Sequence, residues 1–118
     1  MERQTPNRRE AGQCYEEKAA AFLRQQGYEI LDRNYRDRYG EVDIVAREGQ
    51  YLVFVEVKYR KDMRNGYPEE AVSARKQGRI RHTAAWYLHR HGYGDQTPCR
   101  FDVVSVMGEE ISLIRDAF

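Results

Sequence analysis

Three residues in the middle of the chain have the types and spacing that metal-assisted hydrolysis of a phosphodiester requires. Asp43 stands in one strand-like segment, and Glu56 and Lys58 stand two residues apart in the next. Carboxylate oxygens suit Mg²⁺, which takes few protein ligands and fills its other positions with water and substrate oxygens. A neighbouring lysine can orient the attacking water or neutralise negative charge in the transition state. We therefore predict a catalytic group made of Asp43, Glu56 and Lys58.

A simpler interpretation is open, because Asp…Glu-x-Lys is a loose pattern that ordinary surface ion pairs also satisfy. Three placements favour a functional site. Glu56 and Lys58 follow directly on the most apolar run of the chain, residues 51–55, and Asp43 interrupts another apolar run. Glu16, beside the apolar stripe of the first predicted helix, would supply a further carboxylate. Charges in core strands cost free energy, so several of them together indicate a site.

Hydrophobic periodicity predicts the elements that would hold these residues. Apolar residues recur at helical spacing in residues 8–26 and 73–91, with Gly27 as a stop and Ser73 as an N-cap. Strand patterns cover residues 28–35, 41–47, 51–59, 100–107 and 111–115. Tight turns join the first three strands, which we expect to form an antiparallel meander that brings Asp43 close to Glu56.

The expected order α-β-β-β-α-β-β predicts one α/β domain over residues 1–118, with residues 1–7 as a flexible arm and helices covering a central sheet. Within residues 51–59, side chains should alternate between the two faces of the sheet. Val53, Val55 and Val57 would face one way. The other face would carry Leu52, Phe54, Glu56 and Lys58.

Positive charge is concentrated next to the third strand, although the chain as a whole carries only +1. Residues 59–91 contain eight basic and three acidic residues. The excess would form a face that follows phosphates, or it is an ordinary solvated helix surface. For the first interpretation we predict Arg60, Lys76 and Arg79 as nucleic-acid-binding residues.

Composition limits the broad class of the protein. A chain of 118 residues forms one domain of ordinary size, and a net charge of +1 excludes a strongly basic nucleic-acid coat. Cys14 and Cys99 have no zinc-finger spacing, and two free thiols in a reducing compartment are the plainer interpretation. The polar N-terminus and the short apolar runs predict a soluble cytoplasmic protein without a membrane segment.

Five segments of the sequence resemble a known family, and two of them form its central block. The segments Gly40-Glu41-Val42-Asp43-Ile44-Val45-Ala46 and Leu52 to Arg60 are similar to the YraN-type family of bacterial proteins, as are residues 12–19, 27–34 and 100–104. That family is similar in fold and motif to archaeal Holliday-junction resolvases and to the restriction-endonuclease-like superfamily with its PD-(D/E)xK signature. The resemblance implies a restriction-endonuclease-like mixed sheet flanked by helices.

Residue by residue, the resemblance assigns Asp43, Glu56 and Lys58 to the signature, and Glu16 to the glutamate that resolvase-like members carry on the first helix. It implies Mg²⁺ or Mn²⁺ held by Glu16, Asp43, Glu56 and the carbonyl of Val57. Lys76 matches a family position on the second helix. The sequence departs from the pattern at Val42, where the signature has Pro, and at Tyr15, where the family usually has Gly.

The leading hypothesis is a metal-dependent endonuclease that hydrolyses structured or branched DNA, with DNA favoured over RNA as the partner. A homodimer is implied by the resolvase likeness, because a four-way junction needs two symmetric cuts. The alternative is a nucleic-acid-binding or assembly protein that keeps the nuclease fold and does not cleave. A third hypothesis is an interaction domain in which the charges form a buried network.

Overall fold

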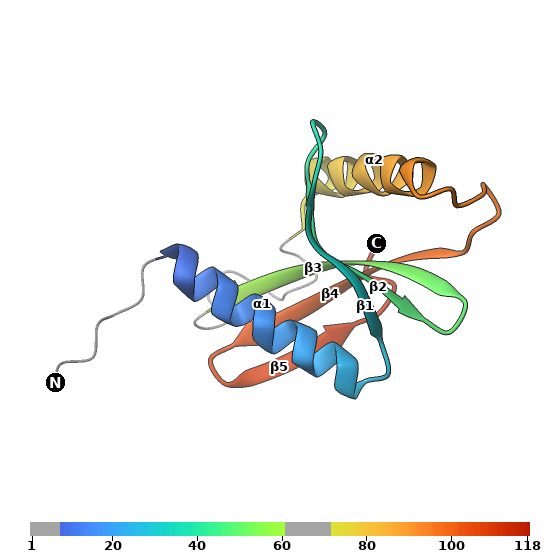
Figure 1. Cartoon of the computed structure of the whole chain (residues 1–118). Coiled ribbons are helices and arrows are strands. Elements are labelled where there is room, and N and C mark those ends of the chain that lie inside the picture. The colour runs from blue at the N-terminus through green and yellow to red at the C-terminus, as the bar shows by residue number, and fades with distance from the viewer. Residues whose placement is uncertain (1–7, 61–71) are drawn as a thin grey trace, which may run out of the picture.

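The computed structural model describes the backbone of residues 8–60 and 72–118, and the side chains of residues 14–59 and 72–118. The predicted arm, residues 1–7, and part of the basic stretch, residues 61–71, lie outside the described residues. The elements follow the predicted order (Figure 1). They are α1 (Arg8–Gln25), β1 (Glu29–Arg36), β2 (Glu41–Glu48), β3 (Tyr51–Arg60), α2 (Ala74–Arg90), β4 (Cys99–Met107) and β5 (Glu110–Ile114).

The five strands form one mixed sheet in the order β1-β2-β3-β4-β5. β1, β2 and β3 are the predicted antiparallel meander. β4 joins β3 in parallel, which requires a long crossover, and α2 lies in that crossover. β5 pairs antiparallel with β4 at the far edge. The expected mixed α/β sheet flanked by two helices is therefore confirmed.

Each face of the sheet has its own core, as the alternation in β3 predicted. On one face, Ala19, Ala20 and Leu23 of α1 pack against Val53 and Val55. On the other, the side chains of α2 pack against the alternate residues of β3: Ile80, Ala84 and Tyr87 against Leu52 and Phe54. In Figure 1, α1 and α2 lie on either side of the sheet. Glu56 and Lys58, in step with Phe54, therefore belong to the α2 face.

Both helices have the termini that the sequence predicted. Gly27 takes φ +95° after α1, and the Tyr28 amide donates to the Leu23 carbonyl at 3.0 Å. This left-handed turn favours glycine and satisfies a carbonyl at the helix end. Ser73 is the N-cap of α2, where its side-chain oxygen accepts a hydrogen bond from the Lys76 amide at 3.2 Å. The cap fixes where the first turn of α2 begins.

The tip of the β1–β2 hairpin is fastened to α2, beside which it rises in Figure 1. Asp37 Oδ1 accepts hydrogen bonds from the amides of Tyr39 and Gly40, at 2.8 and 3.1 Å, and from the Thr83 hydroxyl at 3.3 Å. The ring of Tyr39 stacks on His82, with centroids 3.7 Å apart. A Cβ at Gly40 would lie only 3.3 Å from Thr83 Oγ1. The absence of a side chain at Gly40 therefore allows the hairpin to lie close to α2. The start of β2 is thereby held against α2.

Two further observations concern the cysteines and the helices. Cys14 and Cys99 are both free thiols, the first exposed and the second partly buried. Neither of the helices in the described ranges is long and apolar enough to cross a membrane.

Candidate active site

The site begins where β2 separates from β3. The antiparallel ladder between them runs from Glu48↔Tyr51 to Ile44↔Val55 and ends there, whereas β2 continues to pair with β1 as far as Glu41. Asp43 and Glu56 stand one step beyond the last pair, on opposite sides of the opening. Their side chains share the α2 face, because Asp43 is in step with Val45 and Glu56 with Phe54. The two acidic residues that stood 13 positions apart in the sequence are thus brought together.

The backbone of β3 lines the same opening. The amide of Val57 donates a hydrogen bond to Asp43 Oδ2 at 2.8 Å, in place of a ladder bond. In an extended strand the N–H and C=O of one residue point toward the same neighbouring strand. The carbonyl of Val57, which the family resemblance implies as a metal ligand, therefore also faces the gap that Asp43 fills.

Glu56 is the most buried acid of the site, with a side chain that is 7% exposed, and it is shared by two lysines. Lys76 Nζ lies 2.5 Å from Glu56 Oε1, and Lys58 Nζ lies 3.4 Å from the same oxygen. Burial, and after it the proximity of Lys76, lower the pKa of Lys58, although Glu56 opposes this. For Lys76, burial acts to lower the pKa, but Glu56 and Lys58 together raise it above its ordinary value.

The surroundings of Asp43 disfavour its charged form. Burial, followed by repulsion from Glu56, raises its pKa to about 7, and the hydrogen bond from the Val57 amide acts in the other direction. Glu16 and Glu41 add smaller repulsions that also raise the pKa of Asp43. Glu16, half-buried on α1, therefore lies near enough for its charge to act on Asp43.

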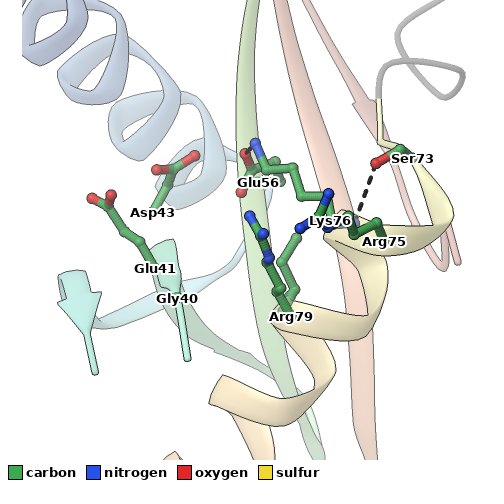
Figure 2. Close-up of a pocket in the computed structure, with 9 residues that line it drawn as sticks. Gly40, Glu41, Asp43, Glu56, Ser73, Arg75, Lys76 and Arg79 are labelled. Atoms are coloured by element: carbon green, nitrogen blue, oxygen red, sulfur yellow. Dashed lines mark hydrogen bonds and ion pairs between the residues drawn. The ribbon is translucent and has the colours of Figure 1, made fainter. Parts of the chain in front are cut away.

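A pocket of about 470 Å³ opens over Asp43 and Glu56, whereas Glu16 and Lys58 are not among the residues that line it. Figure 2 shows the acidic side chains of Glu41 and Asp43 on β2 at one side, and the basic side chains of α2 at the other, with Glu56 of β3 between them. The pocket is lined by Gly40, Glu41, Asp43, Glu56, Ser73, Arg75, Lys76, Arg79 and Ile80. Acidic and basic groups thus meet in one cavity.

The first turn of α2 carries Arg75 and Lys76 and no acidic residue. The positive end of a helix dipole favours acids there and disfavours cations. These two cations consequently oppose the helix that carries them and add to the positive potential at its N-terminus. Lys76 is compensated by Glu56, whereas Arg75 is an exposed cation on the pocket wall, where it favours an anion. No role was predicted for Arg75 from the sequence, although an N-cap followed by two cations is a readable signal.

The donor set fits a hard divalent cation. Among the described residues, no three His, Cys, Asp or Glu side chains are gathered to hold a metal ion. Two carboxylates and a backbone carbonyl are present, and Mg²⁺ is commonly bound by one or two carboxylates with water in its other positions. Burial and repulsion from Glu56 raise the pKa of Asp43, and a divalent ion bound beside the two acids would relieve both effects. Asp43, Glu56 and the Val57 carbonyl would therefore hold the ion, with Glu16 nearby.

The predicted nucleic-acid-binding residues are placed in three different ways. The Arg60 side chain lies outside the described residues. Arg79 is exposed and lines the pocket, as a phosphate-binding residue would. Lys76 differs from the expectation of an outer docking residue, because its ammonium group is engaged by Glu56 inside the site. Glu41, at the start of β2, lines the pocket and pairs with Arg36 at 3.3 Å.

Fold and site together define a class: small α/β proteins with an acid–lysine site at a split between two strands of a mixed sheet. The chain belongs to the family described as Uncharacterised protein family UPF0102, whose model matches residues 15–106. The resemblance to the YraN-type family is thereby confirmed. The matched segment contains every predicted site residue, from Glu16 to Arg79.

Individual relatives agree over nearly the whole chain. A UPF0102 protein of Lachnoclostridium phytofermentans is 55% identical over 112 residues, which cover 95% of each chain. A UPF0102 protein of Caldicellulosiruptor saccharolyticus is 45% identical, over 95% of this chain and 99% of the relative. One from Fusobacterium nucleatum is 41% identical, over 93% and 92%. These matches establish the family and leave the reaction to be argued from the site.

Proposed function

We propose that this chain is a metal-dependent nuclease that hydrolyses phosphodiester bonds with Mg²⁺ or Mn²⁺. The observation that carries the proposal is the convergence of Asp43, Glu56 and Lys58 at the split between β2 and β3, over which a pocket with basic walls opens. A surface ion pair needs no such pocket. It also gives no reason for an acid to be buried beside a second acid.

Each residue of the site has a distinct role in this proposal. Asp43 and Glu56 bind the divalent ion through their carboxylates, and the Val57 amide fixes the orientation of Asp43 through the hydrogen bond to Oδ2. When bound, the ion supplies a Lewis acid for the phosphoryl oxygen and lowers the pKa of a bound water. Lys58, whose own pKa is lowered by burial, positions the attacking water and can exchange a proton with it.

The substrate backbone would be held by the basic wall of the pocket. Arg75 and Arg79 line it beside the N-terminus of α2, and both side chains are exposed. Guanidinium groups bind phosphate oxygens through paired hydrogen bonds, and a helix N-terminus adds unsatisfied amides. Because the net charge of the whole chain is only +1, binding should depend on this local wall.

The substrate class that we propose is structured or branched DNA, with a homodimer making symmetric cuts. Both points rest on the likeness to resolvases that the sequence motif carries. A cleavage screen tests the proposal, with labelled four-way junctions, flaps, duplexes and single strands of DNA and RNA, each in Mg²⁺, Mn²⁺ and EDTA. Light scattering on the same samples gives the oligomeric state. We expect cleavage that requires a divalent ion and is fastest on a branched DNA.

Matched variants distinguish cleavage by this site from cleavage by a contaminating nuclease and from a general loss of structure. Asp43→Asn, Glu56→Gln and Lys58→Met should each lower the cleavage rate by about a hundredfold or more. Glu110→Gln on β5 makes the same chemical change as Glu56→Gln at an exposed position and should leave the rate unchanged. Tight nucleic-acid binding without cleavage on any substrate would contradict the nuclease proposal and support the non-cleaving alternative.

A further inference from the structure

An aromatic stack lies beside the site, on the α1 side of β3. The rings of Tyr15 in α1 and Tyr59 in β3 are nearly parallel, with centroids 3.8 Å apart and an angle of 13° between their planes. Tyr15 directly precedes Glu16, and Tyr59 directly follows Lys58. Tyr59 is in step with Val57, which packs against the α1 core, so its ring stands on the opposite face from Lys58.

The ring of Tyr59 remains accessible. It is 41% exposed, although a stacked tyrosine pair at a sheet end would be expected to bury more of its apolar area. Tyr51, at the other end of β3, is similarly exposed at 45%, but the guanidinium of Arg100 lies over its ring, 5.2 Å from the centroid. In the described part of the chain, the ring that stacks on Tyr59 is Tyr15, and a ligand would contact the exposed part of the Tyr59 ring.

One cation lies beside the stack, since Lys18 Nζ is 5.9 Å from the centroid of the Tyr15 ring. Tyr59 is three residues from Glu56, or about 10 Å along a strand. Stacked nucleotides are spaced about 3.4 Å apart along one strand, so two or three of them cover that distance. A planar ring close to a cationic phosphate site is the arrangement that single-stranded nucleic acid binds by stacking.

We propose that the Tyr15–Tyr59 stack is a platform for an unpaired nucleobase of the nucleic acid whose phosphate enters the pocket. The inference deepens the proposed function and rests on it. A base inside a duplex is covered on both faces by its neighbours and has no face to offer a protein ring. The platform therefore selects a strand with an unpaired base two or three nucleotides from the phosphate that is cut.

The test compares affinities by fluorescence anisotropy in Ca²⁺, with a labelled single strand, the blunt duplex of the same sequence and the same single strand with abasic residues. Tyr59→Ala should weaken binding of the single strand about tenfold and leave duplex binding within twofold. Tyr59→Phe keeps the ring and should bind as wild type does. Tyr59→Leu keeps the bulk without the ring and should bind as Tyr59→Ala does. Tyr51→Ala, at the other end of the strand, is the matched control.

The wild-type protein supplies a test that does not depend on how any variant folds. If a base stacks on Tyr59, the abasic strand should bind wild type about as weakly as the intact strand binds Tyr59→Ala. Equal affinity of wild type for intact and abasic strands would overturn the platform, as would equal losses for single strand and duplex in Tyr59→Leu. Metal-dependent cleavage that continues under those results would leave the proposed function standing, whereas failure of wild type to bind or cleave any nucleic acid would remove both.

Discussion

The ammonium group of Lys76 lies 2.5 Å from Glu56 Oε1, in the space beside the carboxylate where a divalent ion would bind. Lys58 faces the same oxygen at 3.4 Å, so two cations share one buried acid. With Asp43 and Glu56 ionised, the two lysines balance the two acids. Entry of a divalent ion would add two positive charges beside them. Lys76, with 40% of its side chain exposed, has room to leave, whereas Lys58 is more enclosed at 21%.

The first prediction is that Lys76 competes with the metal ion for Glu56. Lys76→Met keeps the length of the side chain and removes its charge, so Mg²⁺ and Mn²⁺ should bind about tenfold more tightly to this variant. Isothermal titration calorimetry measures the change directly. Lys18→Met serves as the matched control, since it removes an exposed lysine of α1 and should leave metal affinity unchanged. Weaker metal binding by Lys76→Met would mean that Lys76 holds Glu56 in its binding position.

The second prediction concerns Asp43, whose pKa of about 7 is far above its ordinary value of 3.8. A carboxyl with a raised pKa in the folded state favours folding while it is protonated. Stability should therefore fall as the pH rises from about 4 to about 7, by up to about 1.4 kcal/mol per pH unit from this group. Asp43→Asn removes the charge and still accepts the hydrogen bond from the Val57 amide.

This variant should consequently be more stable than wild type at pH 8 in EDTA, by about 2–4 kcal/mol, and about equally stable at pH 4. Chemical denaturation across that pH range measures both. Addition of Mg²⁺ at pH 8 should stabilise wild type and leave Asp43→Asn unchanged, because the ion compensates a charge that the variant lacks. A variant that is less stable than wild type in EDTA at pH 8 would indicate an ion-pair role for Asp43.

The features of the fold and the site that depend on local sequence patterns could be predicted from the sequence. Period-two alternation correctly assigned Glu56 to the α2 face of β3, and turn chemistry correctly gave the Asp37 hairpin. Asp102 interrupts an apolar strand, a position that favours a structural hydrogen bond, and it accepts one from Tyr28 at 2.6 Å. The pairing of Lys76 with Glu56 could not be predicted from the sequence. The crossover between β3 and α2 carries no periodic pattern that fixes the position of α2 in space relative to β3. The same holds for the Tyr15–Tyr59 stack, which joins elements 44 positions apart.

The third prediction assigns phosphate binding to Arg75 and Arg79, since Lys76 is engaged within the site. The double variant Arg75→Ala, Arg79→Ala should weaken binding about equally for all sequences. It should flatten the slope of log affinity against log salt concentration by about 1.4 to 1.8, the value for two lost phosphate contacts. Salt titrations by anisotropy measure that slope. Arg24→Ala, Arg90→Ala removes the same net charge at two exposed helix ends and should change the slope much less.

The last prediction separates the site from the network on the other face of the sheet. Arg100, which is 13% exposed, donates to both oxygens of Asp102 at 2.9 Å and pairs with Glu48 at 2.5 Å. Asp102 is fully buried, so Arg100→Met leaves a buried charge without its cation and should cost about 3–5 kcal/mol of stability. Arg100→Lys keeps the charge and loses the paired geometry, and its loss should be intermediate.

The network should also be recognised by how the stability of the protein changes at acid pH. The pKa of Glu48 is lowered to about 2, first by Arg115 and also by Arg100, against the effect of burial. A lowered pKa stabilises the fold above the ordinary value of about 4.5, and that contribution is lost as the pH falls toward 2. Because Arg115 acts first, Arg100→Met should keep part of this acid dependence. The gain in melting temperature on adding Mg²⁺ at pH 8 should equal that of wild type, since Asp102 is in step with Val104 on the α1 face. A folded Arg100→Met protein that no longer responds to Mg²⁺ would show that the network supports the metal site through the sheet.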